Sequence, residues 1–192
     1  MEEIEYKKCK IKVIQDEYTE SPREWENTGT MICFHKRYSL GDSHDLKSED
    51  YCSWQEVKEE IEKMYQPFMI LPLYLYDHSG ITISTSPFSC RWDSGQVGFI
   101  FVTEQKIKEE FIETAEKDLE KRVRDILNAE VETFDKYIRG EVYGYVAEDH
   151  EGNSIDSCSG YYDCDDMIKE AQYSIDCYLE DIEKTIGKMV IY

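Results

Sequence analysis

Residues 97–140 read VGFIFVTEQKIKEEFIETAEKDLEKRVRDILNAEVETFDKYIRG. The run Val97–Val102 is almost wholly apolar, which is typical of a central strand that is buried on both faces. Thr103 can accept a backbone hydrogen bond as the N-cap of a helix that follows it. Apolar residues then recur every three or four positions for five turns, as on the buried face of a long helix. Gly140 is placed to end that helix, and we expect a break in it near Thr114. The apolar positions are Leu119, Val123, Ile126, Leu127, Val131, Phe134 and Ile138.

Shorter segments before this stretch predict strands and one helix. Residues 4–14 alternate apolar and charged side chains, with a change of phase near Lys8 that indicates a bulge. The other strand candidates are Thr30–Tyr38, Phe68–Tyr76 and Ile81–Ser84. A turn that ends in Gly80 joins the last two into a hairpin. The capping box Ser53–Glu56 predicts a short helix over 54–65.

The C-terminal part of the chain predicts a second hairpin, Glu141–Ala147 with Ser154–Tyr161, and a last helix over Asp165–Thr185. The apolar face of that helix is formed by Met167, Ala171, Ile175, Tyr178, Leu179 and Ile182. Clustered strands with single helices between them favour an α+β fold. We expect a mainly antiparallel sheet with three to four helices packed on one face. We also expect a single domain over 1–192, in which 140–186 form an acidic C-terminal hairpin and helix.

The composition excludes several classes of protein. A chain of 192 residues with 41% hydrophobic residues is long enough for one domain with a core. No run of about 18 apolar residues occurs, so we expect no transmembrane helix. The first residues lack the apolar segment of a signal peptide, which favours a cytoplasmic protein.

The cysteines follow no pairing pattern. They are Cys9, Cys33, Cys52, Cys90, Cys158, Cys164 and Cys177. A Cys-x-x-Cys pair is missing, and the four histidines form no His-x-x-x-His motif. In a reducing cytosol such cysteines are free thiols. We therefore expect neither a metal site nor a cofactor.

The net charge of −20 is the most pronounced feature of the composition. An anionic surface repels nucleic acids and anionic membranes, so we expect no direct binding to either, and a basic protein is the partner that fits. The charge is also uneven. Residues 140–183 contain 13 Asp and Glu against one Lys, a net charge of −12, which leaves −8 for the rest of the chain.

Acidic residues of the C-terminal part can resemble a phosphate backbone. Residues i and i+4 of a helix lie about 5–6 Å apart, close to the spacing of phosphates along a nucleic-acid strand. The predicted partner-binding residues are Asp149, Glu151, Asp156, Asp163, Asp165, Asp166, Glu170, Asp176, Glu180, Asp181 and Glu183. The alternative is a solvated surface without a partner, or one that binds divalent cations loosely.

Two polar turns, at 77–80 and 92–95, suggest an alternative function, that of an enzyme. Such an enzyme would be a small hydrolase or a nucleotide-modifying protein. The groups that it could use are Cys33, His78, Cys90 and Asp93. However, the chain contains no Gly-x-Ser-x-Gly elbow, phosphate-binding loop or calcium loop. We therefore interpret both turns as structural and predict no catalytic residues.

Four stretches resemble a known group of proteins. They are PREW at 22–25, GTMICFHKRY at 29–38, ILPLYLYDHSGITISTSPFSCRWDSGQVGFI at 70–100 and FDKYIRGEVYGY at 134–145. Over roughly residues 20–160 the chain is similar to a family of small acidic proteins carried by bacteriophages and other mobile elements. The resemblance implies an anti-CRISPR or anti-restriction inhibitor acting in the cytoplasm of a bacterial host.

Charge and resemblance together predict an inhibitor that binds and blocks a nucleic-acid-processing defence enzyme. The expected partner is a basic nucleic-acid-binding protein such as a CRISPR effector nuclease or a restriction enzyme. Its channel for guide RNA or target DNA would receive the acidic C-terminal part. A phage adaptor that binds a host protein without mimicking nucleic acid is a further alternative. Nothing in the sequence predicts an oligomeric state.

Overall fold

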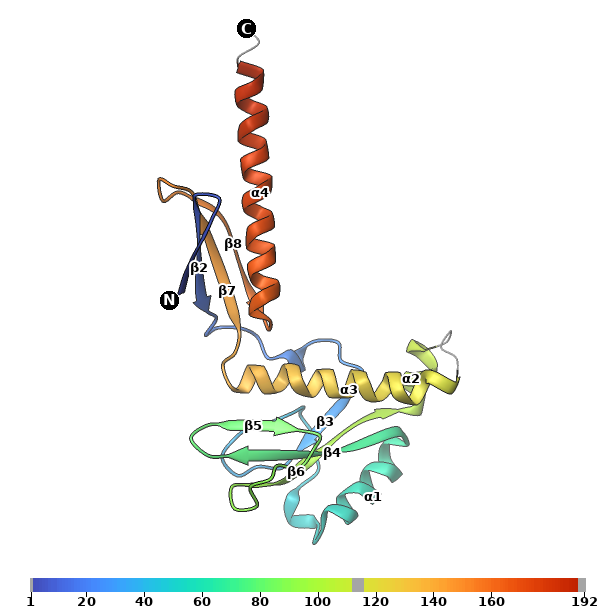
Figure 1. Ribbon diagram of the computed structural model, residues 1–192. Helices are drawn as coiled ribbons and strands as arrows, with labels where there is room; N and C mark the ends of the chain where they lie inside the picture. The colour runs from blue at the N-terminus through green and yellow to red at the C-terminus, as the bar shows by residue number, and fades with distance from the viewer. Residues whose placement is uncertain (1, 112–115, 190–192) are drawn as a thin grey trace. The chain divides into compact units, whose positions relative to one another are not determined.

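The computed structural model describes residues 2–111 and 116–189. The chain divides into two compact units, Met1–Glu20 with Gly140–Tyr192 (unit 1) and Ser21–Arg139 (unit 2). Each contains a four-stranded antiparallel sheet, with one helix packed on it in unit 1 and several in unit 2 (Figure 1). The α+β class with antiparallel sheets is confirmed, although two sheets replace the single one expected. The single domain over 1–192 stays a prediction. None of the described helices has the length and apolar character of a membrane span.

The sheet of unit 1 combines strands from two distant segments of the chain, 2–15 and 143–161. Its elements are β1 (Glu2–Tyr6), β2 (Cys9–Gln15), β7 (Tyr143–Glu148), β8 (Ser154–Tyr161) and the helix α4 (Cys164–Met189). The strand order is β1-β2-β7-β8. Alternate residues of β2, such as Ile11 and Val13, point to the core because successive strand side chains face opposite sides. There they pack with α4 through Met167, Ala171 and Ile175, all fully buried.

The opposite face of this sheet is polar and paired. Lys12 binds Glu148 across β2 and β7 at 2.6 Å, and Lys10 binds Glu3 across β1 and β2 at 3.7 Å. The alternation of charged and apolar residues in 4–14 is explained by these two faces.

A tight turn, not a bulge, causes the change of phase near Lys8, so that expectation was wrong. Tyr6 pairs with Cys9, which leaves Lys7 and Lys8 as a two-residue hairpin turn. Both residues have positive φ, 48° and 68°. Asn-Gly is the usual sequence for such a turn, so two lysines gave no recognisable signal.

Replacing Lys8 with glycine should therefore stabilise the β1–β2 hairpin. A left-handed conformation costs a residue with a Cβ about 1–2 kcal/mol, and the extra entropy of glycine in the unfolded chain offsets part of this gain. We expect a net gain of about 0.5 kcal/mol, measured as slower hydrogen exchange of the β1 and β2 amides. Lys8→Ala keeps the Cβ and is the control. Equal exchange in the two variants would contradict the proposed strain.

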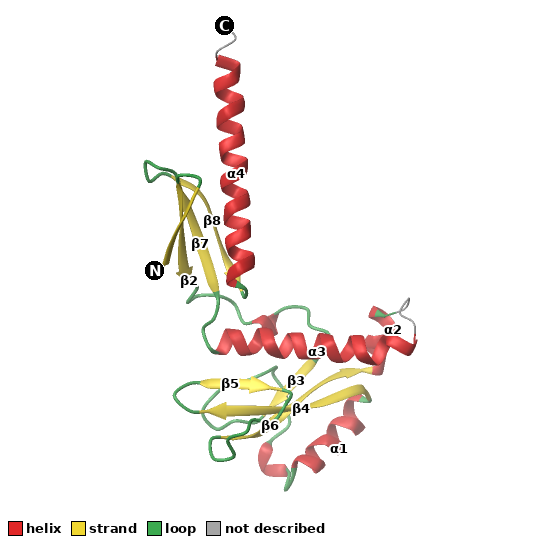
Figure 2. Cartoon of the chain, viewed as in Figure 1, coloured by secondary structure: helices red, strands yellow, loops and turns green. Residues whose placement is uncertain are grey.

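Unit 2 contains the remaining elements. They are β3 (Thr30–Cys33), α1 (Trp54–Tyr65), β4 (Pro67–Asp77), β5 (Ile81–Ser84), β6 (Ser94–Thr103), α2 (Glu104–Glu110), α3 (Glu116–Ile138) and the 3-10 turns Pro22–Glu24 and Ser48–Asp50. The strand order β3-β6-β4-β5 confirms a central place for β6 (Figure 2). Gly98 permits the close approach of β3, because a Cβ there would lie 1.9 Å from the carbonyl oxygen of Ile32.

The two faces of the unit 2 sheet carry different helices. Ile100 and Val102 of β6 pack in the cluster that contains α3, whereas Phe99 and Phe101 pack in the cluster with Ile61 of α1. Helices therefore cover both faces of this sheet, and the expectation that all helices share one face was wrong. Every side chain of the run 97–102 is buried because both faces of β6 are covered.

Three of the expected helix ends are confirmed, whereas α4 continues to Met189, four residues beyond the expected Thr185. Ser53 accepts a hydrogen bond from the Glu56 amide at 3.3 Å at the start of α1, and Thr103 accepts one from the Lys106 amide at 3.2 Å at the start of α2. Gly140 follows α3 with φ of 70°. The break expected near Thr114 lies outside the described residues.

A buried ion cluster ties the start of unit 2 to α3. The Arg23 side chain is only 4% exposed and donates to both carboxylate oxygens of Asp42, at 2.8 and 2.7 Å. It also donates to Glu130 of α3 at 3.1 Å and to the Gly29 carbonyl at 2.6 Å. Glu130 accepts from the amide of Thr28 at 2.7 Å. Every charge in the cluster thus has an oppositely charged partner, as burial requires.

Candidate functional site

Seven of the eleven acidic residues that the sequence predicts to bind a partner lie on α4. An α-helix turns 100° per residue, and the buried side of α4 is formed by Met167, Ala171 and Ile175. The acidic residues of the helix fall mainly on the other side and are exposed. We call six of them the acidic face: Asp165, Asp166, Glu170, Glu180, Asp181 and Glu183. From Asp165 to Glu183 the helix rises about 27 Å.

Two lysines lie among these acids. Lys169 binds Asp166 at 2.7 Å, and Lys184 lies 3.5 Å from Glu180 and 3.6 Å from Asp181. All of these side chains are exposed, so water screens the pairs and each contributes little to stability. Six carboxylates against two ammonium groups leave the acidic face strongly negative. Such a surface attracts cations and basic protein surfaces.

Asp149 has a structural role instead. It is 8% exposed and lies in the loop of the β7–β8 hairpin. One carboxylate oxygen accepts from the amides of Glu151 and Asn153 at 2.9 and 2.8 Å, and the other accepts from the Asn153 side chain at 2.9 Å. The hydrogen bonds from Asn153 lower the pKa of Asp149. We therefore remove Asp149 from the predicted surface, whereas Glu151 beside it is exposed.

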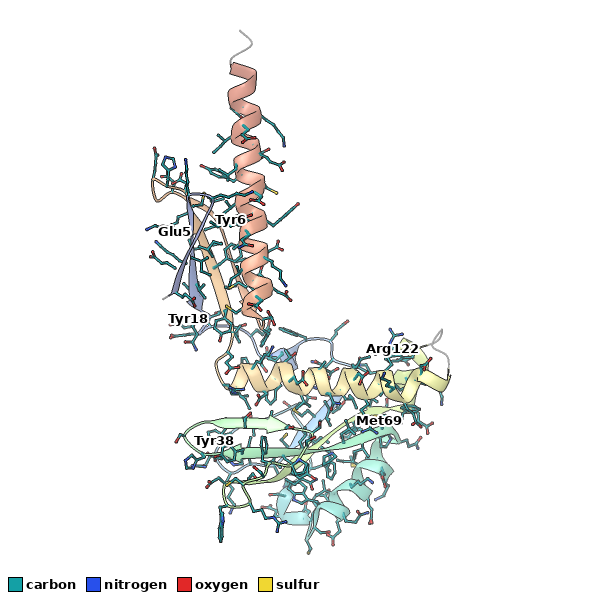
Figure 3. All side chains as sticks on the ribbon, in the orientation of Figure 1. Glu5, Tyr6, Tyr18, Tyr38, Met69 and Arg122 are labelled. Atoms are coloured by element: carbon teal, nitrogen blue, oxygen red, sulfur yellow. The ribbon has the colours of Figure 1, made fainter. Side chains whose placement is uncertain are left out.

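Asp156 and Asp176 also hold unit 1 together. Asp156 of β8 accepts from the hydroxyls of Tyr145 at 2.6 Å and Ser174 at 2.7 Å, and these bonds lower its pKa. Asp176 of α4 binds the β1–β2 hairpin, since it accepts from Lys7 at 2.8 Å and from Tyr6 at 3.2 Å (Figure 3). Its pKa is lowered chiefly by Lys7.

Asp163 is the N-terminal cap of α4. Its carboxylate accepts from the Asp166 amide at 3.0 Å, and its carbonyl accepts from the Met167 amide at 3.1 Å. Such a cap satisfies amides that have no partner within the helix. Of the eleven predicted binding residues, four thus make contacts that hold the strands, turns and helix start of unit 1 in place: Asp149, Asp156, Asp163 and Asp176. The partner-binding role of the eleven residues stays a prediction, and the seven that do not hold the fold in this way are the better candidates.

The apolar face of α4 continues beyond the part that the sheet covers. Leu179 and Tyr178 are half-buried, and Ile182, which the sequence placed on the same face, is 37% exposed. Residues 180–185 are all exposed. Glu180, Asp181 and Glu183 of the acidic face therefore lie on a part of α4 that is exposed to solvent.

The two polar turns of unit 2 lie next to each other. The Asp77 amide donates to the Asp93 carbonyl at 2.8 Å. The Asp93 carboxylate lies 3.3 Å from His78 Nδ1 and 3.5 Å from Cys90 Sγ. Asp93 thus lies between the thiol and the imidazole, whereas a thiol nucleophile needs the imidazole as its direct partner. These contacts support a structural role for the turns.

Cys33 lies at the end of β3 and is 8% exposed. Burial raises the pKa of its thiol to about 12. Only the thiolate is a strong nucleophile, so this thiol is inert at neutral pH. Among the described residues, no cluster of three or more His, Cys, Asp or Glu side chains is placed to hold a metal ion.

The sequence analysis missed a groove in unit 2. It has a volume of about 1000 Å³ and is lined by the segments 33–37, 46–54 and 96–97. Phe34, Tyr51 and Trp54 line it together with Lys36 and Lys47. No pattern of spacing links three such distant segments, so a sequence motif could not have identified it.

Comparison with protein-family models, with curated proteins and with solved structures finds no significant match to this chain.

Proposed function

We propose that the protein binds a basic nucleic-acid-processing enzyme of a bacterial defence system and blocks it through the acidic face of α4. The observation that carries this proposal is the arrangement of six exposed carboxylates along α4, with two lysines beside them among the side chains described over 164–185. An exposed surface of one sign favours association with a surface of the opposite sign. Enzymes that bind nucleic acid present Lys and Arg to the phosphates, so their channels have the required charge.

The shape of the acidic face supports mimicry of a nucleic-acid strand. The helix is a rigid rod on which Asp166 and Glu170, and again Glu180 and Glu183, lie one turn apart, about 5–6 Å. About 15 Å of helix separates these two groups of carboxylates. A rigid array does not lose the conformational entropy that a flexible acidic tail would lose on binding. A bound α4 would occupy the channel and exclude guide RNA or target DNA.

We further propose which kind of basic enzyme is the partner. A CRISPR effector nuclease fits best because it holds a heteroduplex of about 20 base pairs in a positively charged channel. The proposed place of action is the host cytoplasm. A restriction enzyme has a similar basic DNA-binding surface and belongs to the same proposal.

Inhibition by occupancy predicts an equimolar end point. We expect DNA cleavage by a purified, guide-loaded CRISPR effector to fall linearly and stop when the protein equals the effector in concentration. The assay is a titration against several effectors and one restriction enzyme. Cys33→Ala, Cys90→Ala and His78→Ala should each leave the end point unchanged, because occupancy needs no nucleophile.

Two results would contradict the proposal. One is inactivation of many effectors by one molecule, lost in any of those three variants, which would indicate an enzyme. The other is unimpaired cleavage by every nuclease tested at a large excess of the protein. Circular dichroism of each variant checks that the fold is intact.

A further inference from the structure

The groove of unit 2 has an aromatic wall. The ring centroids of Phe34 and Trp54 lie 6.0 Å apart, and those of Phe34 and Tyr51 lie 6.5 Å apart. Trp54 also packs edge-on against Phe99 of β6, at 6.1 Å. All three wall residues are half-buried, so they are held by the core on one side and open to the groove on the other. A flat ligand ring can stack on such a surface.

The rim of the groove is positive in a chain that carries −20 overall. Lys36, Arg37 and Lys47 line it, against Glu49 as the acidic residue of the lining. Arg37 binds Asp77. Lys36 and Lys47 form no ion pair with a carboxylate of the described residues. With Arg37 paired, Lys36 and Lys47 against Glu49 leave a net charge of +1 in the lining, which favours an anion although the whole protein repels anions.

The turn that carries Lys36 is held in place. His35 Nδ1 accepts hydrogen bonds from the amides of Arg37 at 3.3 Å and Tyr38 at 3.2 Å. Its ring stacks on Tyr38, with centroids 4.9 Å apart. The positive rim is thus attached to a structured segment next to the aromatic wall.

The start of α1 forms another part of the groove, where the Glu56 carboxylate offsets the partial positive charge of the helix end. Cys52, Ser53 and Trp54 line the groove, and the first turn of a helix carries a partial positive charge. The Glu56 side chain accepts from the Cys52 amide at 2.8 Å and so fixes this end of the helix. Cys33 in the lining is protonated at neutral pH and neither repels an anion nor reacts with it.

We propose that this groove binds a small anion that carries a flat aromatic ring, the chemistry of a nucleotide. The ring would stack on Trp54 and Phe34, and the phosphate would bind Lys36 and Lys47. A bare phosphate would make no stacking contact with the aromatic wall, and a neutral ring would form no ion pair with the two lysines. A long nucleic-acid strand would meet the negative charge of the whole protein. The volume of the groove suits a small molecule.

The test measures binding of AMP, GMP, UMP and ADP to the full chain by isothermal titration calorimetry. At least one should bind, and adenosine or pyrophosphate alone should bind at least about tenfold more weakly than the matching nucleotide. Lys36→Glu combined with Lys47→Glu should weaken binding by about tenfold or more, since attraction becomes repulsion. Trp54→Ala should cost about tenfold through lost stacking.

Controls separate lost contacts from lost structure. Lys63→Glu changes an exposed lysine of α1 outside the groove and should leave nucleotide affinity unchanged. The lysine variants change only exposed side chains, so they remain informative if Trp54→Ala loses its fold. The proposal is overturned if none of the four nucleotides binds at millimolar concentration, or if pyrophosphate binds as tightly as ADP. It is also overturned if a single-stranded oligonucleotide binds far more tightly than every mononucleotide.

Discussion

Reversing three charges of the acidic face, in the combined variant Glu170→Lys, Glu180→Lys and Glu183→Lys, should weaken inhibition of the target nuclease by more than about tenfold. Even at about 0.5 kcal/mol per site, three lost attractions sum to about 1.5 kcal/mol, which is roughly tenfold in affinity. Each new lysine also repels the basic partner and adds to the loss. The inhibition constant in the cleavage assay is the measurement.

The fold should survive these reversals. All three residues are exposed, and Lys184 keeps its contact with Asp181. Asp176 is left unchanged because it binds Lys7 and Tyr6. Removing repulsion between like charges should change stability by only a few tenths of a kcal/mol.

The matched control reverses three exposed acids of unit 2, Glu59, Glu62 and Glu120, to lysine. It produces the same change in net charge on α1 and α3. We expect little effect on inhibition, because these residues lie outside the acidic face. If both triple variants lose inhibition equally, total charge rather than the acidic face governs binding.

Replacing Arg23 with methionine should lower the free energy of unfolding of unit 2 by about 3–5 kcal/mol. Removing one partner of a buried ion cluster leaves the others as unpaired charges, and a penalty of about this size follows. Here Asp42 and Glu130 would lose a partner that donates to both. Trp25, Trp54 and Trp92 all belong to unit 2, so tryptophan fluorescence in urea reports the unfolding of this unit.

The variant Arg37→Met is the control, because it removes an arginine from an ion pair that is exposed rather than buried. Arg37 too binds an aspartate, Asp77, but its side chain is 66% exposed. Arg37→Met should cost less than about 1 kcal/mol, because water screens an exposed pair and can solvate the aspartate that remains. If Arg23→Met and Arg37→Met lowered the free energy of unfolding by similar amounts, burial would not explain the contribution of the Arg23 cluster to stability.

Much of the fold was predictable from local patterns. The spacing of Val123, Leu127 and Val131 predicted the buried face of α3, and all three are buried in the structure. The capping residues Ser53 and Thr103 predicted where α1 and α2 begin. Such signals depend on neighbours within one helical turn, so the sequence carries them directly.

The division into two sheets depends on long-range pairing. β2 pairs with β7, which lies about 130 residues later in the chain. Both strands read as half-exposed segments, and nothing in their alternation identifies the partner strand. The Lys7–Lys8 turn was missed for a different reason, since lysine is rarely found at positive φ.

The acidic surface was only partly predictable. Charge counting showed that acids gather in the part of the chain that forms α4, but it could not separate Glu170, which is exposed, from Asp156, which binds two hydroxyl groups. Those partners, Tyr145 and Ser174, come from β7 and α4. Only the folded arrangement of unit 1 distinguishes an acid that holds the structure from one that is free to bind a partner.

Salt dependence of binding tests the central proposal most directly. The measurement is the dissociation constant of the wild-type protein for the nuclease that it inhibits, between about 50 and 200 mM salt. If the acidic face binds a phosphate channel, affinity should fall at least about tenfold over this range, and the triple variant Glu170→Lys, Glu180→Lys, Glu183→Lys should show a much shallower dependence. An affinity of the wild-type protein that stays constant across the range would contradict nucleic-acid mimicry by α4.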